Sequence, residues 1–186
     1  MRAHCGLWRM LGVACALGAL APSISATSIK PISVETLTQR SELVVEARAE
    51  RSWAQWNPQH TLIYTYTRFA TGHTLKGTAP PEFTVRQMGG SAGGYMQHVA
   101  GLRYWLPNEE AVLFLRPSEE RGVMSVVGLM QGNFMIARSP EGVGFASNGV
   151  PGVEIYAPGQ QGAQEYSGAR IPLRELERRV LKAARK

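Results

Sequence analysis

The sequence predicts a mainly β protein, a small antiparallel barrel or meander with a short helix before it and an amphipathic helix after it. Three observations lead to this fold class. Short segments rich in β-branched and aromatic residues recur between residues 42 and 147, and hairpin-sized turns separate them. This region lacks the regular alternation of strands and helices that a parallel sheet requires. Residues 169–186 carry apolar side chains at helical spacing.

Residues 1–26 have the layout of a secretory signal peptide. Arg2 and Arg9 precede an uncharged apolar run, and a stretch of small residues ends at Ala26, after which we expect cleavage. The apolar run is too short to span a bilayer. Lipidation at Cys15 is an alternative, although the leucine expected three residues before a lipidated cysteine is missing. We therefore expect a periplasmic or secreted protein without a membrane span.

The first elements expected after the signal peptide are a short helix and two strands. Ser33 is a suitable N-cap, and residues 33–41 place Val34 on the apolar side of a short helix. Residues 42–53 alternate between apolar and more polar side chains, which predicts a half-buried strand. Residues 61–77 are rich in Thr, Tyr, Ile and Phe and predict a long second strand.

Five further strands are predicted, at residues 82–88, 110–116, 123–129, 133–139 and 143–147. The second of them reads "EAVLFLR", and this nearly continuous apolar run indicates burial on both faces of the sheet. The last two are joined by "SPEG", which contains the Pro and Gly of a hairpin turn. Successive hairpin-sized turns favour a meander or a small closed barrel.

The exported chain is expected to hold one domain followed by a linker and a helix. Residues 27–147 make the barrel domain with its leading helix, and residues 148–168 are rich in Gly and Pro, which is typical of a surface linker. Residues 169–186 form the closing helix, in which three apolar side chains share one stripe: Leu173, Leu176 and Val180.

The composition restricts the chemistry of the exported chain. Both cysteines, Cys5 and Cys15, lie in the predicted signal peptide, so we expect a chain without disulfides that is stabilised by packing alone. All 14 acidic residues are glutamate. The absence of aspartate excludes EF-hand loops and the Asp form of a catalytic triad.

The positive net charge comes from the end of the chain. Residues 170–186 hold seven Lys or Arg and two Glu, whereas the rest of the exported chain is close to neutral. Basic residues at the end of a helix complement its dipole and lie in solvent. We therefore expect no nucleic-acid partner.

Residues 42–138 resemble netrin-like modules, the group that includes tissue inhibitors of metalloproteinases. The likeness rests on "SELVVEARAE", on a long strand that ends in "HTLKG", on "FTVRQMGG" and on "NEEAVLFL". The segments "EEAVLFL" and "VVGLMQGNF" are also similar to those of uncharacterised exported bacterial proteins. The resemblance implies a five-stranded OB-type barrel and a role in binding other proteins. Netrin-like inhibitors begin with a zinc-chelating cysteine, which the chain expected after cleavage lacks, so no inhibitory residue carries over.

Residues 89–93, "GGSAG", fit the G-x-S-x-G pattern of serine hydrolases. His98 lies seven residues beyond Ser91, and Glu109 or Glu110 could orient it. The pattern requires a strand-to-helix elbow, and the following segment lacks a helical stripe. We therefore expect a glycine-rich connection between strands, with a small serine hydrolase that uses Ser91 and His98 as the alternative.

No metal or cofactor site is predicted. His60, His73 and His98 are far apart in the sequence and form no H-x-H or H-x-x-x-H pair. Only the fold could assemble a zinc site from them. We expect these histidines to be solvated or to lie at the edge of the core.

The aromatic residues near the loops are the best candidates for binding. Trp53 and Trp56 bracket the first turn, and Tyr95, Tyr104 and Trp105 lie around the glycine-rich segment. Exposed loop aromatics anchor partners, but buried loop anchors give the same pattern and are favoured because large aromatics usually pack.

The candidate binding residues are thus Trp53, Trp56, Tyr95, His98, Tyr104 and Trp105. The sequence favours an exported, non-enzymatic binding or interaction module whose partner is another exported protein or a component of the cell envelope. Besides the hydrolase, the alternative is an inhibitor or chaperone of an exported metalloprotease, which only the netrin-like resemblance suggests.

Overall fold

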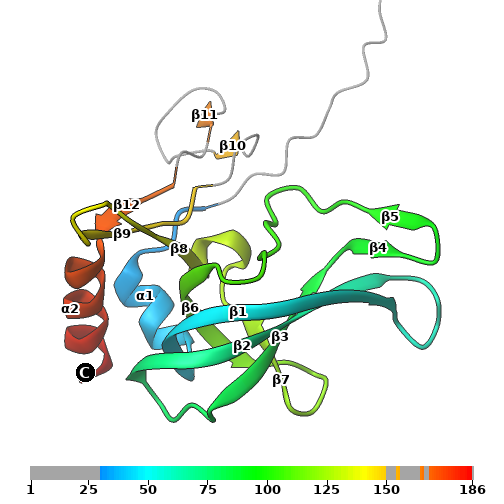
Figure 1. Ribbon diagram of the computed structural model, residues 1–186, viewed down its shortest axis with the longest axis horizontal. Coiled ribbons are helices and arrows are strands. Elements are labelled where there is room, and N and C mark those ends of the chain that lie inside the picture. Colours follow the sequence, from blue (N-terminus) through cyan, green and yellow to red (C-terminus); the bar gives the residue numbers. More distant parts are fainter. Residues whose placement is uncertain (1–29, 150–153, 156–163, 166–167, 186) are drawn as a thin grey trace, which may run out of the picture.

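The computed structural model describes residues 30–149, 154–155, 164–165 and 168–185 (Figure 1). The predicted signal peptide, with both cysteines, and most of the predicted linker lie outside the described residues. Within the described part, no helix is long and apolar enough to cross a membrane.

Five strands close into a ring: β1 (Leu43–Trp56), β2 (Ile63–Lys76), β3 (Glu82–Met88), β6 (Glu110–Pro117) and β7 (Val123–Val126). β1 pairs with β2 on one edge and with β6 on the other, β2 pairs with β3, and β6 pairs with β7. β3 and β7 join the two ends of this row and close the ring. A closed ring of five strands is the architecture of an OB-type barrel, so the predicted mainly β fold is confirmed.

One pair in the ring departs from the antiparallel meander that the turns suggested. β3 and β7 run parallel, with Thr84 opposite Val123 and Val85 opposite Met124. A parallel pair requires a long crossover between its strands. Here the crossover contains the hairpin of β4 (Gly90–Ala92) and β5 (Tyr95–Gln97), and then β6.

The inside of the barrel is filled by alternate side chains of its strands. On β1 the inward residues are those predicted from the alternation, from Leu43 to Ala49, and on β6 they run from Ala111 to Leu115. The other buried members of this inner core are Phe69, Phe83, Val85 and Trp105. The two-residue period of the strands thus places one apolar face of β1 and β6 in the interior.

A second core lies against the outside of β1 and β6. Val44, Val112 and Phe114 point away from the barrel and pack under α1 (Val34–Arg40) and α2 (Leu173–Ala184). Both helices therefore cover the same side of the barrel, as Figure 1 shows. β6 is buried on both faces, as its continuous apolar run predicted.

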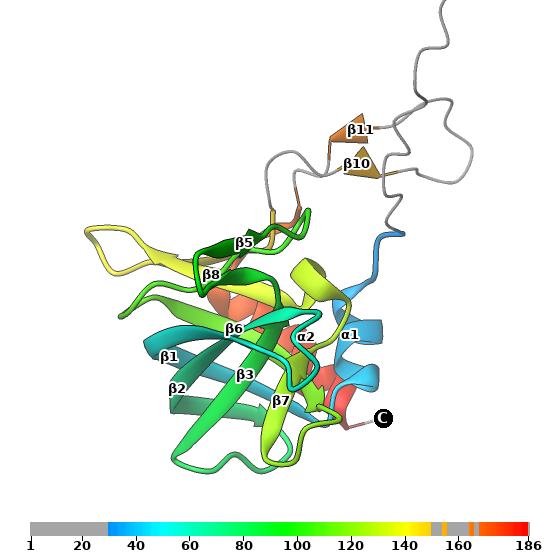
Figure 2. The same cartoon turned by 90° about the vertical axis from the view of Figure 1, so that its right-hand side faces the viewer.

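The remaining strands extend the sheet beyond the ring. β8 (Asn133–Arg138), β9 (Gly144–Ser147) and β12 (Arg170–Pro172) follow β6 in the sheet order. β10 (Glu154–Ile155) pairs with β11 (Gln164–Glu165) in a separate two-stranded sheet. Figure 2, turned toward the right-hand side of Figure 1, shows the β4–β5 hairpin in front and α2 behind the barrel.

Two predicted boundaries were wrong. The strand expected over residues 123–129 ends at Val126, because Gly128 adopts the left-handed conformation and begins η1 (Leu129–Gly132), a single 3₁₀ turn. The helix expected over residues 169–186 begins only at Leu173, because Arg170–Pro172 pairs with β9 as strand β12.

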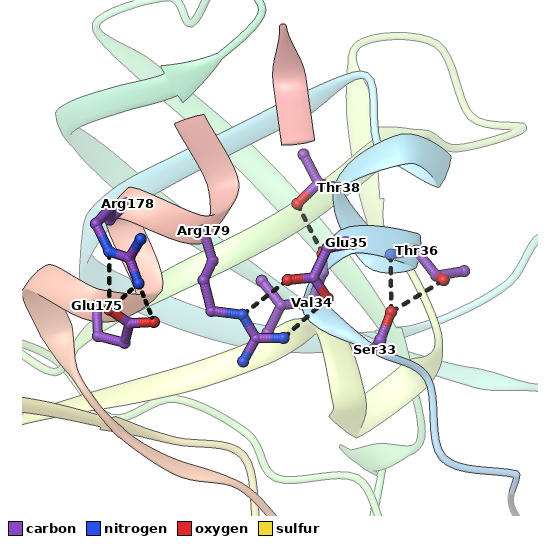
Figure 3. Close-up of polar contacts among 8 residues, drawn as sticks. All are labelled: Ser33, Val34, Glu35, Thr36, Thr38, Glu175, Arg178 and Arg179. Atoms are coloured by element: carbon purple, nitrogen blue, oxygen red, sulfur yellow. Dashed lines mark hydrogen bonds and ion pairs between the residues drawn. The ribbon is translucent and has the colours of Figure 1, made fainter. Parts of the chain in front are cut away.

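An ion pair joins the two helices across their contact. Arg179 on α2 donates from Nε to Glu35 Oε1 and from Nη2 to Glu35 Oε2, both over 2.8 Å (Figure 3). Ser33 caps α1 as predicted, because its hydroxyl accepts a hydrogen bond from the Thr36 amide at 3.1 Å. The hydrogen bonds from Arg179 lower the pKa of Glu35 from 4.5 to about 2.

The first prediction concerns the acid dependence of this ion pair. Because the pKa of Glu35 is lowered in the fold, the pair stabilises the protein above pH 4.5, and this stabilisation is lost as the pH falls toward 2. The two side chains are 46% and 33% exposed, so solvent screens the pair. We expect Arg179→Gln to lower the free energy of unfolding by about 0.5–1 kcal/mol at pH 7.

The measurement is urea unfolding of both proteins at a series of pH values, in which their difference should shrink below pH 4. Arg178→Gln is the matched control, because Arg178 pairs with Glu175 within α2 and contacts no other element through that pair. A pH-independent difference for Arg179→Gln would contradict the assignment of the stabilisation to Glu35.

The second prediction concerns the packing of the helices on β6. Phe114 is fully buried in the outer core, with its ring 5.7 Å from the ring of Phe134. We expect Phe114→Ala to cost about 3–5 kcal/mol of unfolding free energy, because it leaves a cavity under both helices. Met96→Ala on the exposed hairpin is the control, and equal losses in the two variants would show that the helices do not depend on this core.

Candidate functional site

The glycine-rich segment forms a hairpin. β4 pairs with β5 in antiparallel register, with Ser91 opposite Met96 and Ala92 opposite Tyr95. The two residues between the strands, Gly93 and Gly94, both have positive φ. A two-residue turn of this kind matches the twist of a β-hairpin and favours glycine at both positions.

A third glycine lets the hairpin dock on the barrel. Gly90 has a φ of +124°, and a Cβ at this position would overlap the hydroxyl oxygen of Thr65 on β2. The Thr65 hydroxyl donates to the carbonyl of Gly89 over 2.7 Å, which holds the base of the hairpin on β2. The hairpin also accounts for both glycines of the G-x-S-x-G pattern, because Gly93 lies in its turn and a Cβ at Gly89 would overlap the carbonyl oxygen of Gln97 on β5.

The structure does not build a hydrolase elbow around Ser91. Ser91 lies within β4, and the chain continues into β5 instead of a helix. Among the hydrogen bonds of the described residues, none involves the side chain of Ser91 or that of His98. Glu109 pairs with Arg103 at 2.5 Å and Glu110 with Arg138 at 3.0 Å, so the two candidate orienting carboxylates are held by arginines.

Three aromatic side chains meet where the β1–β2 turn lies beside the hairpin. Trp56 stacks on His60, with ring centroids 5.9 Å apart, and Tyr95 meets Trp56 edge-on at 5.6 Å. We call Trp56, His60 and Tyr95 the aromatic tip. Edge-to-face and stacked pairs of this kind fix the orientation of the rings.

The aromatic tip is accompanied by unusually exposed apolar side chains. Tyr95 is 67% exposed, and its neighbour Met96 is 82% exposed, the highest value among the large hydrophobic residues of the described part. Successive residues of a strand point to opposite faces, so Tyr95 and Met96 present apolar groups on both faces of the hairpin. The β1–β2 turn and the β4–β5 hairpin lie at the same end of the barrel (Figure 1).

Trp53 belongs to a different surface, the outer face of β1–β3. Its ring stacks on Tyr66 at 5.6 Å, and the Arg51 guanidinium lies 4.9 Å from its ring centroid. The Tyr66 hydroxyl donates to Glu120 over 2.8 Å, while burial and this carboxylate raise the pKa of Tyr66. Arg86 also binds Glu120, at 3.2 Å. Arg86 and Glu120 of this face are thus paired with each other, and Trp53 is held between Tyr66 and Arg51.

The two aromatics after the hairpin have structural contacts. Trp105 is 1% exposed, meets Phe69 edge-on at 5.0 Å and donates from its indole nitrogen to Asn133 over 3.1 Å. It is therefore a core residue, which removes it from the candidate binding residues. Tyr104 is half-buried and donates from its hydroxyl to the carbonyl of Met88 over 2.8 Å, which fastens the loop to β3. Burial raises the pKa of Tyr104.

Of the six candidate binding residues, the structure brings only Trp56 and Tyr95 into contact with each other. His98 is exposed just after β5. His60 of the aromatic tip and its exposed neighbour Met96 were not among the binding residues predicted from the sequence. The signal for His60 was its place in the turn "NPQH" beside Trp56, since a short turn keeps such residues close together.

One group of side chains with metal-ligating atoms is also present. Glu46, His73 and Glu177 come from β1, β2 and α2, and their ligating atoms lie within 4.8 Å of one another. Among the described residues, this is the one group of three or more such side chains. Neither His60 nor His98 belongs to it, so the aromatic tip and this group are separate features.

Comparison with known proteins assigns no family to the chain. No protein-family model matches it, and no curated protein matches it. The netrin-like resemblance therefore stays a prediction, and the function has to be inferred from the surfaces of this barrel.

The third prediction tests the role given to the glycines of the hairpin. Alanine at Gly90 meets the Thr65 hydroxyl at a backbone conformation that favours glycine, so we expect Gly90→Ala to cost about 2–4 kcal/mol of unfolding free energy. Gly142→Ala is the matched control, because Gly142 also has positive φ but open space around it, and should cost only about 1 kcal/mol. Equal losses in urea unfolding would contradict the close approach at Gly90.

Proposed function

We propose that this protein is an exported, non-enzymatic binding module that holds another exported protein through the aromatic tip and Met96. The observation that carries the proposal is the exposure of Tyr95 and Met96 beside the ordered Trp56–His60 stack. Large apolar side chains at this exposure are costly in water unless a partner covers them.

The chemistry of these side chains suits a protein partner. Tyr and Trp supply large contact areas and lose little conformational entropy on binding, and they are enriched among the residues that dominate interfaces. The ring contacts of Trp56 hold this side chain in one place before any partner binds, which lowers the entropic cost of association. Met96 is unbranched and polarizable, so it adapts to an irregular apolar surface.

The position of the tip on the barrel supports the same proposal. OB-type barrels bind ligands through one sheet face and through loops such as the one between their first two strands. Here that loop is the β1–β2 turn, and the β4–β5 hairpin lies beside it. Because fold alone does not assign function, the proposal rests on the side chains at this position.

The hairpin also offers a backbone edge. β4 and β5 form a two-stranded sheet in the described part of the chain, so each has its partner strand on one side. An exposed strand edge can accept an extended segment of another protein, with specificity coming from the side chains beside it. Tyr95 and Met96 lie on β5 and would contact such a segment.

The fourth prediction tests the tip by photo-crosslinking. A benzophenone amino acid replaces Tyr95 in the full-length protein, which is exported in its native host and irradiated. We expect one discrete protein adduct, and we expect Trp56→Ala in the same chain to reduce its yield about fivefold or more, because hot-spot aromatics contribute over 1 kcal/mol. Met96→Ser, which changes an exposed side chain, should reduce the yield without affecting thermal unfolding.

The matched control places the crosslinker at Val143, which is exposed on the β8–β9 turn. An adduct of equal yield from Val143, or one that Trp56→Ala and Met96→Ser leave unchanged, would overturn the aromatic tip as the binding site. Labelling of Ser91 by a fluorophosphonate in the folded protein would contradict the non-enzymatic role. The identity of the adduct also tests whether the partner is an exported metalloprotease.

A further inference from the structure

Glu46, His73 and Glu177 converge on one point at the helix end of the barrel. The Nδ1 atom of His73 lies 3.9 Å from Oε1 of Glu46, and all three ligating atoms lie within 4.8 Å of one another. The residues come from β1, β2 and α2, three elements that lie side by side there (Figure 1). This point is at the opposite end of the long β1–β2 hairpin from the aromatic tip.

An irregularity in the pairing of β1 and β2 occurs at this point. Val45 lies opposite Thr74 and Ala47 opposite Thr71, so that Glu46 alone faces both Gly72 and His73. Such a bulge inserts one extra residue and re-aims a side chain, and bulges are frequent next to functional sites. The extra residue in β2 thus brings the ring of His73 to the carboxylate of Glu46.

One oxygen of the Glu46 carboxylate has no hydrogen-bond partner. Its Oε1 atom is buried and makes no hydrogen bond within the described structure. The carboxylate of Glu177 lies close to this oxygen. The guanidinium of the nearby Arg138 is bound to Glu110 through Nε at 3.1 Å and Nη2 at 3.0 Å.

We propose that Glu46, His73 and Glu177 bind a divalent transition-metal ion, and that the ion is Zn²⁺. One imidazole nitrogen and two carboxylate oxygens form a ligand set that suits zinc, whereas Ca²⁺ and Mg²⁺ prefer all-oxygen sites. A buried oxygen without a hydrogen-bond partner, beside a second carboxylate, is satisfied by a cation at this place. The site is independent of the proposed function at the aromatic tip.

The geometry leaves room for the ion and for a fourth ligand. Tetrahedral ligands about 2.0–2.1 Å from Zn²⁺ are about 3.4 Å apart, so the group has to contract by about 1 Å. His73 is largely exposed and can turn to achieve this. Because the His73 side chain is open to solvent, a water molecule can supply the fourth ligand.

Binding of the ion would cross-link α2 to β1 and β2 of the barrel. Glu177 lies on α2, whereas the other two ligands lie on paired strands of the ring. An ion that binds this assembled group and not the unfolded chain stabilises the fold in proportion to its concentration. Zn²⁺ should therefore raise the temperature of unfolding as well as bind.

The fifth prediction is tested on the tag-free protein with Zn²⁺ as the probe. Isothermal titration calorimetry should show one Zn²⁺ per chain, and a Zn²⁺ concentration about 100-fold above the dissociation constant should raise the unfolding temperature by about 5–10 °C. Co²⁺ should bind the same site and show the visible absorption of a four-coordinate ion. His73→Asn, Glu46→Gln and Glu177→Gln should each weaken Zn²⁺ binding about tenfold or more.

Matched controls separate this site from general affinity for metals. His98→Asn and Glu42→Gln change exposed side chains of the same types outside the group and should leave Zn²⁺ binding unchanged. Failure of the wild-type protein to bind Zn²⁺, or binding by folded His73→Asn with wild-type affinity, would overturn the proposal. Neither result would bear on the aromatic tip, whose crosslinking is measured separately.

Discussion

Closure of the five-stranded ring is the constraint on which the rest of the structure depends. The pairing of β3 with β7 joins the two ends of the row of strands, and it removes the free edges that an open sheet would leave. Closure also gives β1 and β6 an inside and an outside. Their inward side chains fill the barrel, and their outward ones, Val44, Val112 and Phe114, form a second core under the two helices. The described part of the chain holds no disulfide and has two apolar cores that share β1 and β6. A loss of packing in one core therefore weakens the other.

The length of the first two strands separates the aromatic tip from the group of Glu46, His73 and Glu177. β1 and β2 are each 14 residues long, which corresponds to roughly 45 Å in an extended strand. The inner core takes its side chains on β1 from Leu43 to Ala49, and β1 then runs on to Trp56. The aromatic tip and Met96 are thus supported by continuous strand backbone but lie outside the inner and outer cores. This arrangement explains how a small domain can expose Tyr95 and Met96 without loosening its interior.

The sequence predicted local structure well because strand periodicity is a local property. The alternation from Leu43 to Ala49 and the continuous apolar run of "EAVLFLR" correctly gave the inward faces of β1 and the double burial of β6. The sequence did not predict the long-range pairing of strands, because the parallel contact of β3 with β7 follows from ring closure and not from a pattern within either strand. The same limit explains Trp105. Its sequence position next to the glycines gave no direction for the ring, and only the closed barrel shows that Phe69 and Asn133 enclose it.

The group of Glu46, His73 and Glu177 shows why distant ligands escape sequence motifs. Metal motifs are recognised when ligands share one helix or one turn, so that their spacing is fixed locally. Here the three residues come from separate elements, and their approach depends on the bulge in β2 and on the seat of α2 over β1. Glu46 nevertheless carried a signal. It lies between Val45 and Ala47, which both point into the barrel, so the two-residue period of the strand places its carboxylate on the outer face of β1. Because α2 packs on this face, Glu177 of α2 and His73 of β2 can approach Glu46, which the sequence of β1 alone does not reveal.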